Sequence, residues 1–398
     1  MCHYFDPSRR TARLRAPITP LPVRGPPAYA AHEPVTGSVM SPPEQSPHPY
    51  TDLPAHAYWR SGVGGVEPLR MQGLWQPKFP ITPADPVATY GSCFAQHIGR
   101  ALRARGHDWL VSEKPPRRVS GEVARRFGYR LFSARTGNIY TPTLLLQWLR
   151  WALGEATPPD TVWPDESGFR DPFRPRIEPD PFDSVAELEK LRAVTLRALA
   201  RSVRKARVFV FTLGLTERWV ETETGCEYPL CPGTSAGRYD PDRHAFAPLD
   251  YPQAHAAMQA ALDLMRAANP RLRFLLTVSP VPLAATASGQ HVLTATSGAK
   301  ATLRAVAGAL AGARADTDYF PSYEMITSPV FGGQFFAPDR RQVTDAGVAF
   351  VMERFFGDMA ARFDLPKTAD SPPPPDAAAD PEEVICDEEM LAAFGPRG

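Results

Sequence analysis

The run Val87-Ala88-Thr89-Tyr90-Gly91-Ser92-Cys93-Phe94-Ala95 contains the residues best suited to chemistry. A short strand-like stretch ends at Gly91-Ser92, and an amphipathic helical pattern begins at once. In a parallel α/β sheet, such a turn lifts the Ser92 hydroxyl above the carboxyl edge, where these sheets bind ligands. The following helix directs backbone N–H groups and its dipole at nearby negative charge. This combination suits a serine nucleophile that builds an oxyanion.

Two other interpretations of this turn remain open. In one, Ser92 is a helix N-cap and Gly91 only eases the turn, because both residue types are common in those positions. In the other, Cys93 is the nucleophile, since a helix N-terminus lowers the pKa of a thiol. A cysteine at such a place is also often a small buried residue with no chemical role.

The composition excludes several classes of protein. The chain has 398 residues, a net charge of +1 and 43% hydrophobic residues, so a large core can form and no strong field attracts nucleic acid or an anionic membrane. The five cysteines, at positions 2, 93, 226, 231 and 386, are scattered and fit a reducing compartment. No signal peptide and no apolar run long enough to span a bilayer are evident, which predicts a cytoplasmic protein.

Alternating strand and helix patterns predict one α/β domain over residues 66–366, with a parallel sheet and helices on both faces. The flanking segments 1–65 and 367–398 are rich in proline, the second also in acidic residues, and are predicted to be disordered. The segments 157–183 and 221–252 are expected to be long irregular loops. The strands are expected at 87–90, 107–111, 207–212, 272–278 and 319–324. The helices are expected at 94–105, 142–152, 184–205 and 253–268, from Lys300 onward, and around 348–355.

Several polar residues follow strand-like runs and should gather at one edge of this sheet. Asn138 would either donate its amide to an oxyanion or a substrate hydroxyl, or only supply a left-handed turn. Glu217 would be a base or a substrate contact, or would only order its loop by pairing with an arginine. Ser279 is a further polar group at the same edge. Cys226, Cys231 and His244 lack a fourth ligand and turn-like spacing, so no metal site is predicted.

Several motifs in this order resemble the GSCFA family, whose members look like SGNH (GDSL-type) hydrolases. The resemblance covers roughly residues 70 to 365 and implies a flavodoxin-like αβα sandwich with a parallel sheet. The stretches that carry it are Gly91-Ser92-Cys93-Phe94-Ala95, Gly137-Asn138-Ile139-Tyr140-Thr141, Thr212-Leu213-Gly214-Leu215-Thr216-Glu217, Thr277-Val278-Ser279-Pro280-Val281-Pro282 and Tyr319-Phe320-Pro321-Ser322-Tyr323-Glu324.

The resemblance also implies roles for individual residues. Ser92 matches the nucleophile of the first SGNH motif, and its N–H together with that of Gly214 would form an oxyanion hole. Asn138 would add a third donor. Asp339 matches the acid of the Asp-x-x-His pair that ends SGNH enzymes.

The chain departs from that pattern at two places. Gln342 stands where the catalytic histidine is expected, and a glutamine cannot accept the proton of Ser92 at neutral pH. Thr216 and Glu217 stand where an asparagine is expected. His291 is the first substitute base to consider and Glu217 the second, while His97 is expected to pack or to cap its helix.

We therefore expect a cytoplasmic serine ester hydrolase or O-acyltransferase that needs no cofactor and acts on an acylated carbohydrate or lipid, the substrate class that the resemblance suggests. The second hypothesis is a non-catalytic carbohydrate-binding or scaffold protein that has lost the catalytic histidine. A thiol mechanism at Cys93 ranks third. The group within hydrogen-bond reach of the Ser92 hydroxyl should discriminate between the first two.

Overall fold

The computed structural model describes residues 48–365 and 385–395. The chain divides into two units, Met1–Leu53 and Pro54–Gly398, and everything below concerns the second. The predicted disorder of residues 1–47, 366–384 and 396–398 lies outside the described residues.

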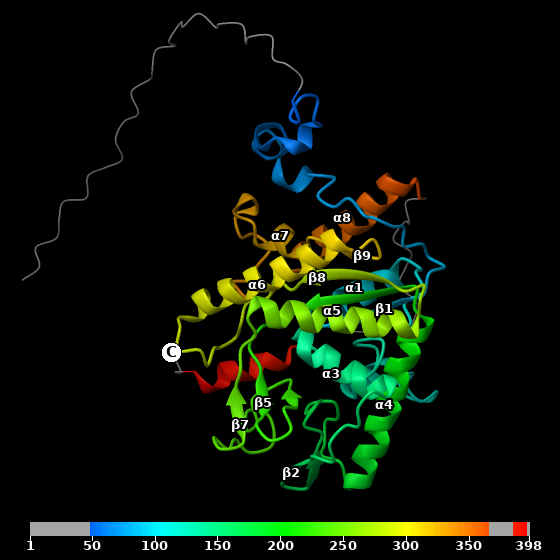
Figure 1. The fold of residues 1–398 in the computed structure, drawn as a ribbon, viewed down its shortest axis with the longest axis vertical. Helices are drawn as coiled ribbons and strands as arrows, with labels where there is room; N and C mark the ends of the chain where they lie inside the picture. Colours follow the sequence, from blue (N-terminus) through cyan, green and yellow to red (C-terminus); the bar gives the residue numbers. More distant parts are fainter. Residues whose placement is uncertain (1–47, 366–384, 396–398) are drawn as a thin grey trace, which may run out of the picture. The chain divides into compact units, whose positions relative to one another are not determined.

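The core of the fold is a four-stranded parallel sheet with the strand order β1-β4-β8-β9 (Figure 1). In this register Gly91 lies beside Thr212, and Thr212 lies beside Thr277, so the carboxyl ends of three strands meet. The strands are β1 (Val87–Gly91), β4 (Val208–Leu213), β8 (Arg273–Val278) and β9 (Thr317–Tyr319). The predicted parallel sheet in a mixed α/β fold is confirmed.

Helices cover both faces of the sheet, as the continuous apolar strands predict. In β4 the side chains of Phe209 and Phe211 belong to one apolar cluster, and those of Val208 and Val210 to the other. The first cluster includes residues of α3 (Pro142–Leu153), α4 (Val185–Lys205), α5 (Tyr251–Ala268) and α6 (Val292–Ala313). The second includes residues of α1 (Ala95–Ala104), α7 (Ser322–Thr327) and α8 (Asp345–Phe363). Within the described residues, no helix is both long enough and apolar enough to cross a membrane.

The two long segments expected to be irregular contain small sheets. A hairpin of β2 (Trp163–Asp165) and β3 (Gly168–Arg170) lies in the first. In the second, β6 (Glu227–Tyr228) and β7 (His244–Phe246) pair antiparallel with β5 (Trp219–Glu221). Strands of two or three residues are too short to produce a readable alternation, which explains why the sequence pattern does not show them.

The strand expected at 107–111 is wrong, because this stretch forms only a single parallel bridge between Val87 and Trp109. The indole of Trp109 turns inward and donates to Thr89 Oγ1 over 2.9 Å, so the stretch bends instead of extending along β1. Asn138 likewise follows an irregular stretch and not a strand. Short elements occur at α2 (Gly121–Arg126), η1 (Ala55–Ala57), η2 (Arg60–Gly64), η3 (Pro68–Arg70) and η4 (Pro329–Phe331).

The prediction of a disordered C-terminal tail is wrong for residues 385–395, which we call the C-terminal segment. It contains the 3₁₀-helix η5 (Asp387–Phe394), the red element in Figure 1. Cys386, Asp387 and Glu388 are buried, although the surrounding sequence is acidic and rich in proline. The partners of Asp387 are Asn138 and Tyr140, about 250 residues earlier in the sequence, which a local pattern cannot reveal.

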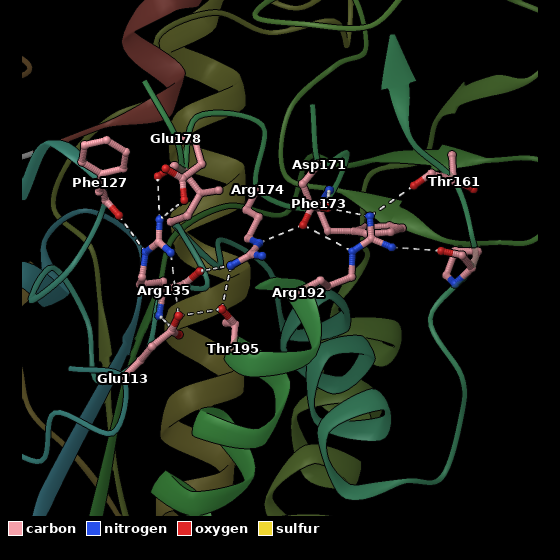
Figure 2. A network of polar contacts seen from close by, with 12 residues as sticks. Glu113, Phe127, Arg135, Thr161, Asp171, Phe173, Arg174, Glu178, Arg192 and Thr195 are labelled. Atoms are coloured by element: carbon pink, nitrogen blue, oxygen red, sulfur yellow. Dashed lines mark hydrogen bonds and ion pairs between the residues drawn. The ribbon is translucent and has the colours of Figure 1, made fainter. Parts of the chain in front are cut away.

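A buried ion network fixes segment 157–183 to α4 (Figure 2). The Asp171 carboxylate accepts from Arg174 Nε over 2.8 Å and from Arg192 Nη2 over 2.9 Å. Arg174 also donates to Thr195 Oγ1 over 2.6 Å, and that hydroxyl donates to Glu113 over 3.1 Å. All five side chains are buried, so the loop is held by charge pairing that water does not screen.

Candidate active site

Gly91 makes the turn at the end of β1 possible. Its φ is +129°, and a Cβ at this position would lie 2.3 Å from the carbonyl oxygen of Thr212. Only glycine adopts such a φ without strain and leaves room for this contact. The close approach of β1 to β4 also positions Ser92, because the Ser92 N–H donates to Thr212 O over 2.9 Å.

We predict that Gly91→Ala lowers the free energy of unfolding by about 3 kcal/mol or more, because backbone strain and overpacking add at this position. Urea unfolding followed by circular dichroism measures the change. Gly298→Ala in α6 is the control, since a Cβ there meets no atom within 4 Å, and it should be neutral or stabilising by up to about 1 kcal/mol. Equal effects at both glycines would contradict the tight approach of β1 to β4.

The Ser92 hydroxyl is buried, and its oxygen has no hydrogen-bond partner among the described residues. The Ser92 side chain packs beside Gly214, where an added Cβ would lie 3.0 Å from Ser92 Cβ. The Gly214 N–H donates to Tyr140 O over 2.9 Å, as the Ser92 N–H does to Thr212 O. Both N–H groups assigned to an oxyanion hole are therefore engaged within the fold.

Lys300 is the ionisable residue that the structure adds to this edge. Its Nζ donates to Gly214 O over 2.7 Å, and only 1% of the residue is exposed. Burial lowers the pKa of Lys300 to about 8, although the negative charge of Glu388 opposes the shift. A lysine on the same helical face as the buried Leu303 and Ala307 was the signal in the sequence that could have identified it.

The C-terminal segment covers this edge of the sheet. The Gln96 side chain donates to Ile385 O over 2.9 Å and accepts from the Ile385 N–H over 3.3 Å. Asn138 Nδ2 donates to Asp387 Oδ2 over 2.7 Å, and the Asp387 N–H donates to the Tyr140 hydroxyl over 3.1 Å. Asn138 therefore binds a carboxylate of the chain itself, and its Oδ1 has no partner among the described residues.

Arg341 also contacts the C-terminal segment. Its Nη2 lies 3.7 Å from Cys386 Sγ and 3.7 Å from Glu388 Oε2, and its Nη1 lies 3.5 Å from Glu389 Oε1. Burial raises the pKa of Glu388 to about 8. Arg341 directly precedes Gln342, so the motif that lacks a histidine contributes an arginine to the site instead.

The segment brings a second cysteine close to Cys93. Cys93 and Cys386 are both buried and free, and Gln96, three residues after Cys93, binds Ile385, the neighbour of Cys386. The nearby Cys93 thiol lowers the pKa of Cys386 to about 7 against the effect of burial, with further help from the charge of Arg341. The nearby Cys386 thiol and burial raise the pKa of Cys93. Cys386 is therefore the more acidic thiol of the pair.

Three of the predicted residues are on the surface and do not hydrogen-bond to Ser92. Asp339 is exposed, and its Oδ1 accepts from the N–H groups of Arg341 and Gln342 over 2.9 and 3.0 Å, which stabilises a turn. Gln342 is exposed as well. His291 is exposed at the N-cap of α6, where its Nδ1 accepts from the Leu293 N–H over 3.1 Å.

The remaining predicted residues lie at or near the sheet edge in mainly structural contacts. Glu217 accepts from the Thr286 hydroxyl, burial raises its pKa, and its charge acts on Glu388. The buried Ser279 donates its N–H to Leu213 O over 2.8 Å. Thr216 is buried.

His97 lies on α1 with its ring 5.4 Å from that of Phe94, and burial lowers its pKa to about 3. Among residues 48–365 and 385–395, no group of three or more His, Cys, Asp or Glu side chains is arranged to hold a metal ion.

Comparison with known proteins supports the motif assignment. No curated protein matches the chain. The model of the GSCFA family matches residues 86–355, which include β1, the Gly91-Ser92 turn and every strand of the parallel sheet. The match spans more than half of the sequence, and the chain belongs to the GSCFA family.

Proposed function

We propose that this protein is a serine ester hydrolase or O-acyltransferase with Ser92 as its nucleophile. The parallel sheet with helices on both faces is compatible with an SGNH-like, flavodoxin-like αβα sandwich, which we propose as its fold type. The substrate class, an acylated carbohydrate or lipid, rests on the resemblance to SGNH hydrolases.

One observation carries the proposal. A buried serine hydroxyl without a partner lies beside a glycine whose carbonyl binds a buried lysine. An unpaired buried hydroxyl costs free energy, and such costs are typical of functional sites. A lysine with a pKa near 8 is partly neutral at physiological pH and can accept a proton, as in Ser-Lys variants of the serine mechanism. We therefore propose Lys300 as the general base. In this structure no described side chain, Lys300 included, is within hydrogen-bond distance of Ser92 Oγ, so this role requires Lys300 Nζ to move from Gly214 O to the hydroxyl when substrate binds.

The proposed reaction has two steps. Ser92 Oγ attacks the acyl carbon while Lys300 accepts the hydroxyl proton, and Lys300 then returns that proton to the leaving alkoxide. Water or an acceptor hydroxyl, deprotonated by Lys300, attacks the acyl-serine, and Lys300 returns the proton to Ser92 Oγ as the acyl group leaves as a carboxylic acid or a new ester. Asn138 Nδ2 now binds the Asp387 carboxylate, so we propose that it binds the carbonyl oxygen of the ester when the segment is displaced.

A fluorophosphonate probe tests this function. We expect Ser92→Ala to abolish labelling of the reduced protein, because the probe reacts with an activated serine hydroxyl. Ser297→Ala is the control, since Ser297 is exposed on α6, and it should label like the wild type. The probe should be applied to the whole chain and to a variant ending at Leu365, because the C-terminal segment covers the site. Labelling of neither folded protein, or of Ser92→Ala as well, would overturn the proposal.

The engaged N–H groups of Ser92 and Gly214 favour a second candidate, the non-catalytic carbohydrate-binding protein. In that case Gln342 and the absent histidine reflect lost activity. Folded protein that fails to label but binds glycans in a calorimetric screen would support this candidate.

A further inference from the structure

The contacts of the C-terminal segment resemble those of a bound ligand. Asn138, Tyr140 and Gln96 contribute side-chain hydrogen bonds to the segment, and Arg341 contributes ion pairs. Gln96 follows Ser92 by four residues, and Asn138 lies in the stretch Gly137-Asn138-Ile139-Tyr140-Thr141 that carries the family resemblance. The segment therefore occupies polar groups that a substrate would need.

The thiol pair lies at the centre of these contacts. Cys93 directly follows Ser92, and Cys386 lies between the residues that bind Gln96 and Asn138. Both cysteines are only 4% exposed, and the paired hydrogen bonds between Gln96 and Ile385 hold the two stretches that carry them together. Arg341 Nη2 lies 3.7 Å from Cys386 Sγ and stabilises its thiolate form. A structural cysteine usually packs among apolar groups, whereas this pair has a cation directed at one sulfur.

We propose that Cys93 and Cys386 form a disulfide when a peroxide oxidises the protein, and that this bond locks the C-terminal segment over Ser92. The proposal that this inhibits turnover rests on the proposed function, whereas formation of the disulfide does not.

Hydrogen peroxide is the oxidant that accepts the two electrons of this reaction. The Cys386 thiolate attacks one peroxide oxygen and breaks the O–O bond, giving a sulfenic acid and hydroxide. The hydroxide takes the proton of Cys93 and becomes water. The Cys93 thiolate then attacks Cys386 Sγ, so that the S–S bond forms, the S–O bond breaks and a second water leaves after protonation. The two thiols lose two electrons and hydrogen peroxide gains them.

Burial does not prevent this sequence, because the segment can open. A short 3₁₀-helix held by side-chain contacts opens at a low free-energy cost compared with the parallel sheet. Peroxide enters while the segment is open, and when the segment closes again the Cys386 thiolate beside Arg341 reacts with it and Cys93 resolves the sulfenic acid. In a reducing compartment both cysteines are thiols, so the segment can open and close freely until an oxidant is present.

The first experiment identifies the bond. The full reduced chain is treated with hydrogen peroxide, digested with trypsin without reductant and analysed by mass spectrometry. We expect a linked species of residues 79–100 and 368–397, which carry Cys93 and Cys386, and its loss after dithiothreitol. Cys386→Ser should abolish this species, and Cys226→Ser should retain it, since Cys226 directly precedes β6 of the small sheet. Folded protein that forms only sulfinic acids, other pairs or no bond would overturn the proposal.

The second experiment measures inhibition. Fluorophosphonate labelling of Ser92 should fall at least about tenfold on oxidation, recover with dithiothreitol and stay unaffected by peroxide in Cys386→Ser. If the disulfide forms but labelling does not fall, the inhibitory lock is wrong. If the disulfide forms and neither the reduced chain nor the variant ending at Leu365 labels, the proposed function is wrong and the disulfide stands.

Discussion

Replacing Lys300 with methionine should lower the rate of Ser92 labelling and ester turnover by about 10²–10⁴-fold, the usual contribution of a positioned acid or base. Methionine preserves most of the apolar stem in a helix face that is buried, so the fold should tolerate it. Lys300→Arg is the stricter variant, because it keeps the positive charge but cannot lose its proton near neutral pH. Both variants should lose activity if Lys300 is the base.

The pH profile separates this role from a structural one. A base must be neutral to act, so the wild-type rate should rise with pH through about 8, the pKa of Lys300. The Glu388 charge raises that pKa, so Glu388→Gln, which leaves the segment in place, should show the same rise at lower pH. The residual activity of Lys300→Met should not show this rise of the rate with pH. If either variant kept the wild-type rate and profile, Lys300 would not be the base.

Asp171→Asn should have the largest effect on stability, a loss of about 3–5 kcal/mol in the free energy of unfolding. Asp171 is the shared partner of Arg174 and Arg192, whose side chains are 0% and 4% exposed, so the variant leaves two buried cations without their carboxylate. A typical domain has only about 5–15 kcal/mol of total stability. Urea unfolding of the variant beside the wild type measures the loss.

The control for this prediction is Glu353→Ala. Glu353 is an ion-pair partner of Arg354, and the Glu353 side chain is 68% exposed. This variant should change stability by less than about 1 kcal/mol. A similar small change in Asp171→Asn would show that the network in Figure 2 does not hold segment 157–183.

Acid should weaken the same network. Burial raises the pKa of Asp171, but the charges of Arg174 and Arg192 outweigh it and hold the pKa below its ordinary value. A carboxyl group with a lowered pKa stabilises the fold above its unfolded pKa of about 4 and loses that contribution as the pH falls through its folded pKa. The contribution of Asp171 should therefore be complete at neutral pH and fade only below about pH 4.

The sequence predicts the elements whose pattern is long and local. β4 and β8 are continuous apolar runs, and the turn at Gly91-Ser92 combines a strand end, a glycine and a helix pattern. The stretch at 107–111 is too short for such a pattern, and the inward turn of Trp109 decides its shape. The C-terminal segment was missed because its composition is that of a disordered tail, while a few side-chain contacts with distant residues order it.

The sequence predicts which turns form the site, but it does not predict the charged side chains that reach it. Strand order brings Ser92 and Gly214 together, and the sequence supports that placement. Lys300 and Arg341 lie outside the quoted motif stretches and reach the site through long side chains. A sequence motif does not determine the direction of such a side chain. His291, chosen because it closely follows Ser279-Pro280, is exposed, and so is Gln342, which stands three residues after Asp339 where a histidine is expected.

The pairing of β1 with β4 also sets the order in which the protein can be completed. Val87 pairs with Val208, about 120 residues later in the chain. At a synthesis rate of 5–20 residues per second, β1 leaves the ribosome roughly 6–24 s before its partner. During that interval nearby residues such as Leu110 and Ser133 can cover one edge of the apolar strand that carries the serine motif. The other edge, which pairs with β4, stays uncovered. The nascent chain should therefore need a chaperone most while residues 91–208 are being made.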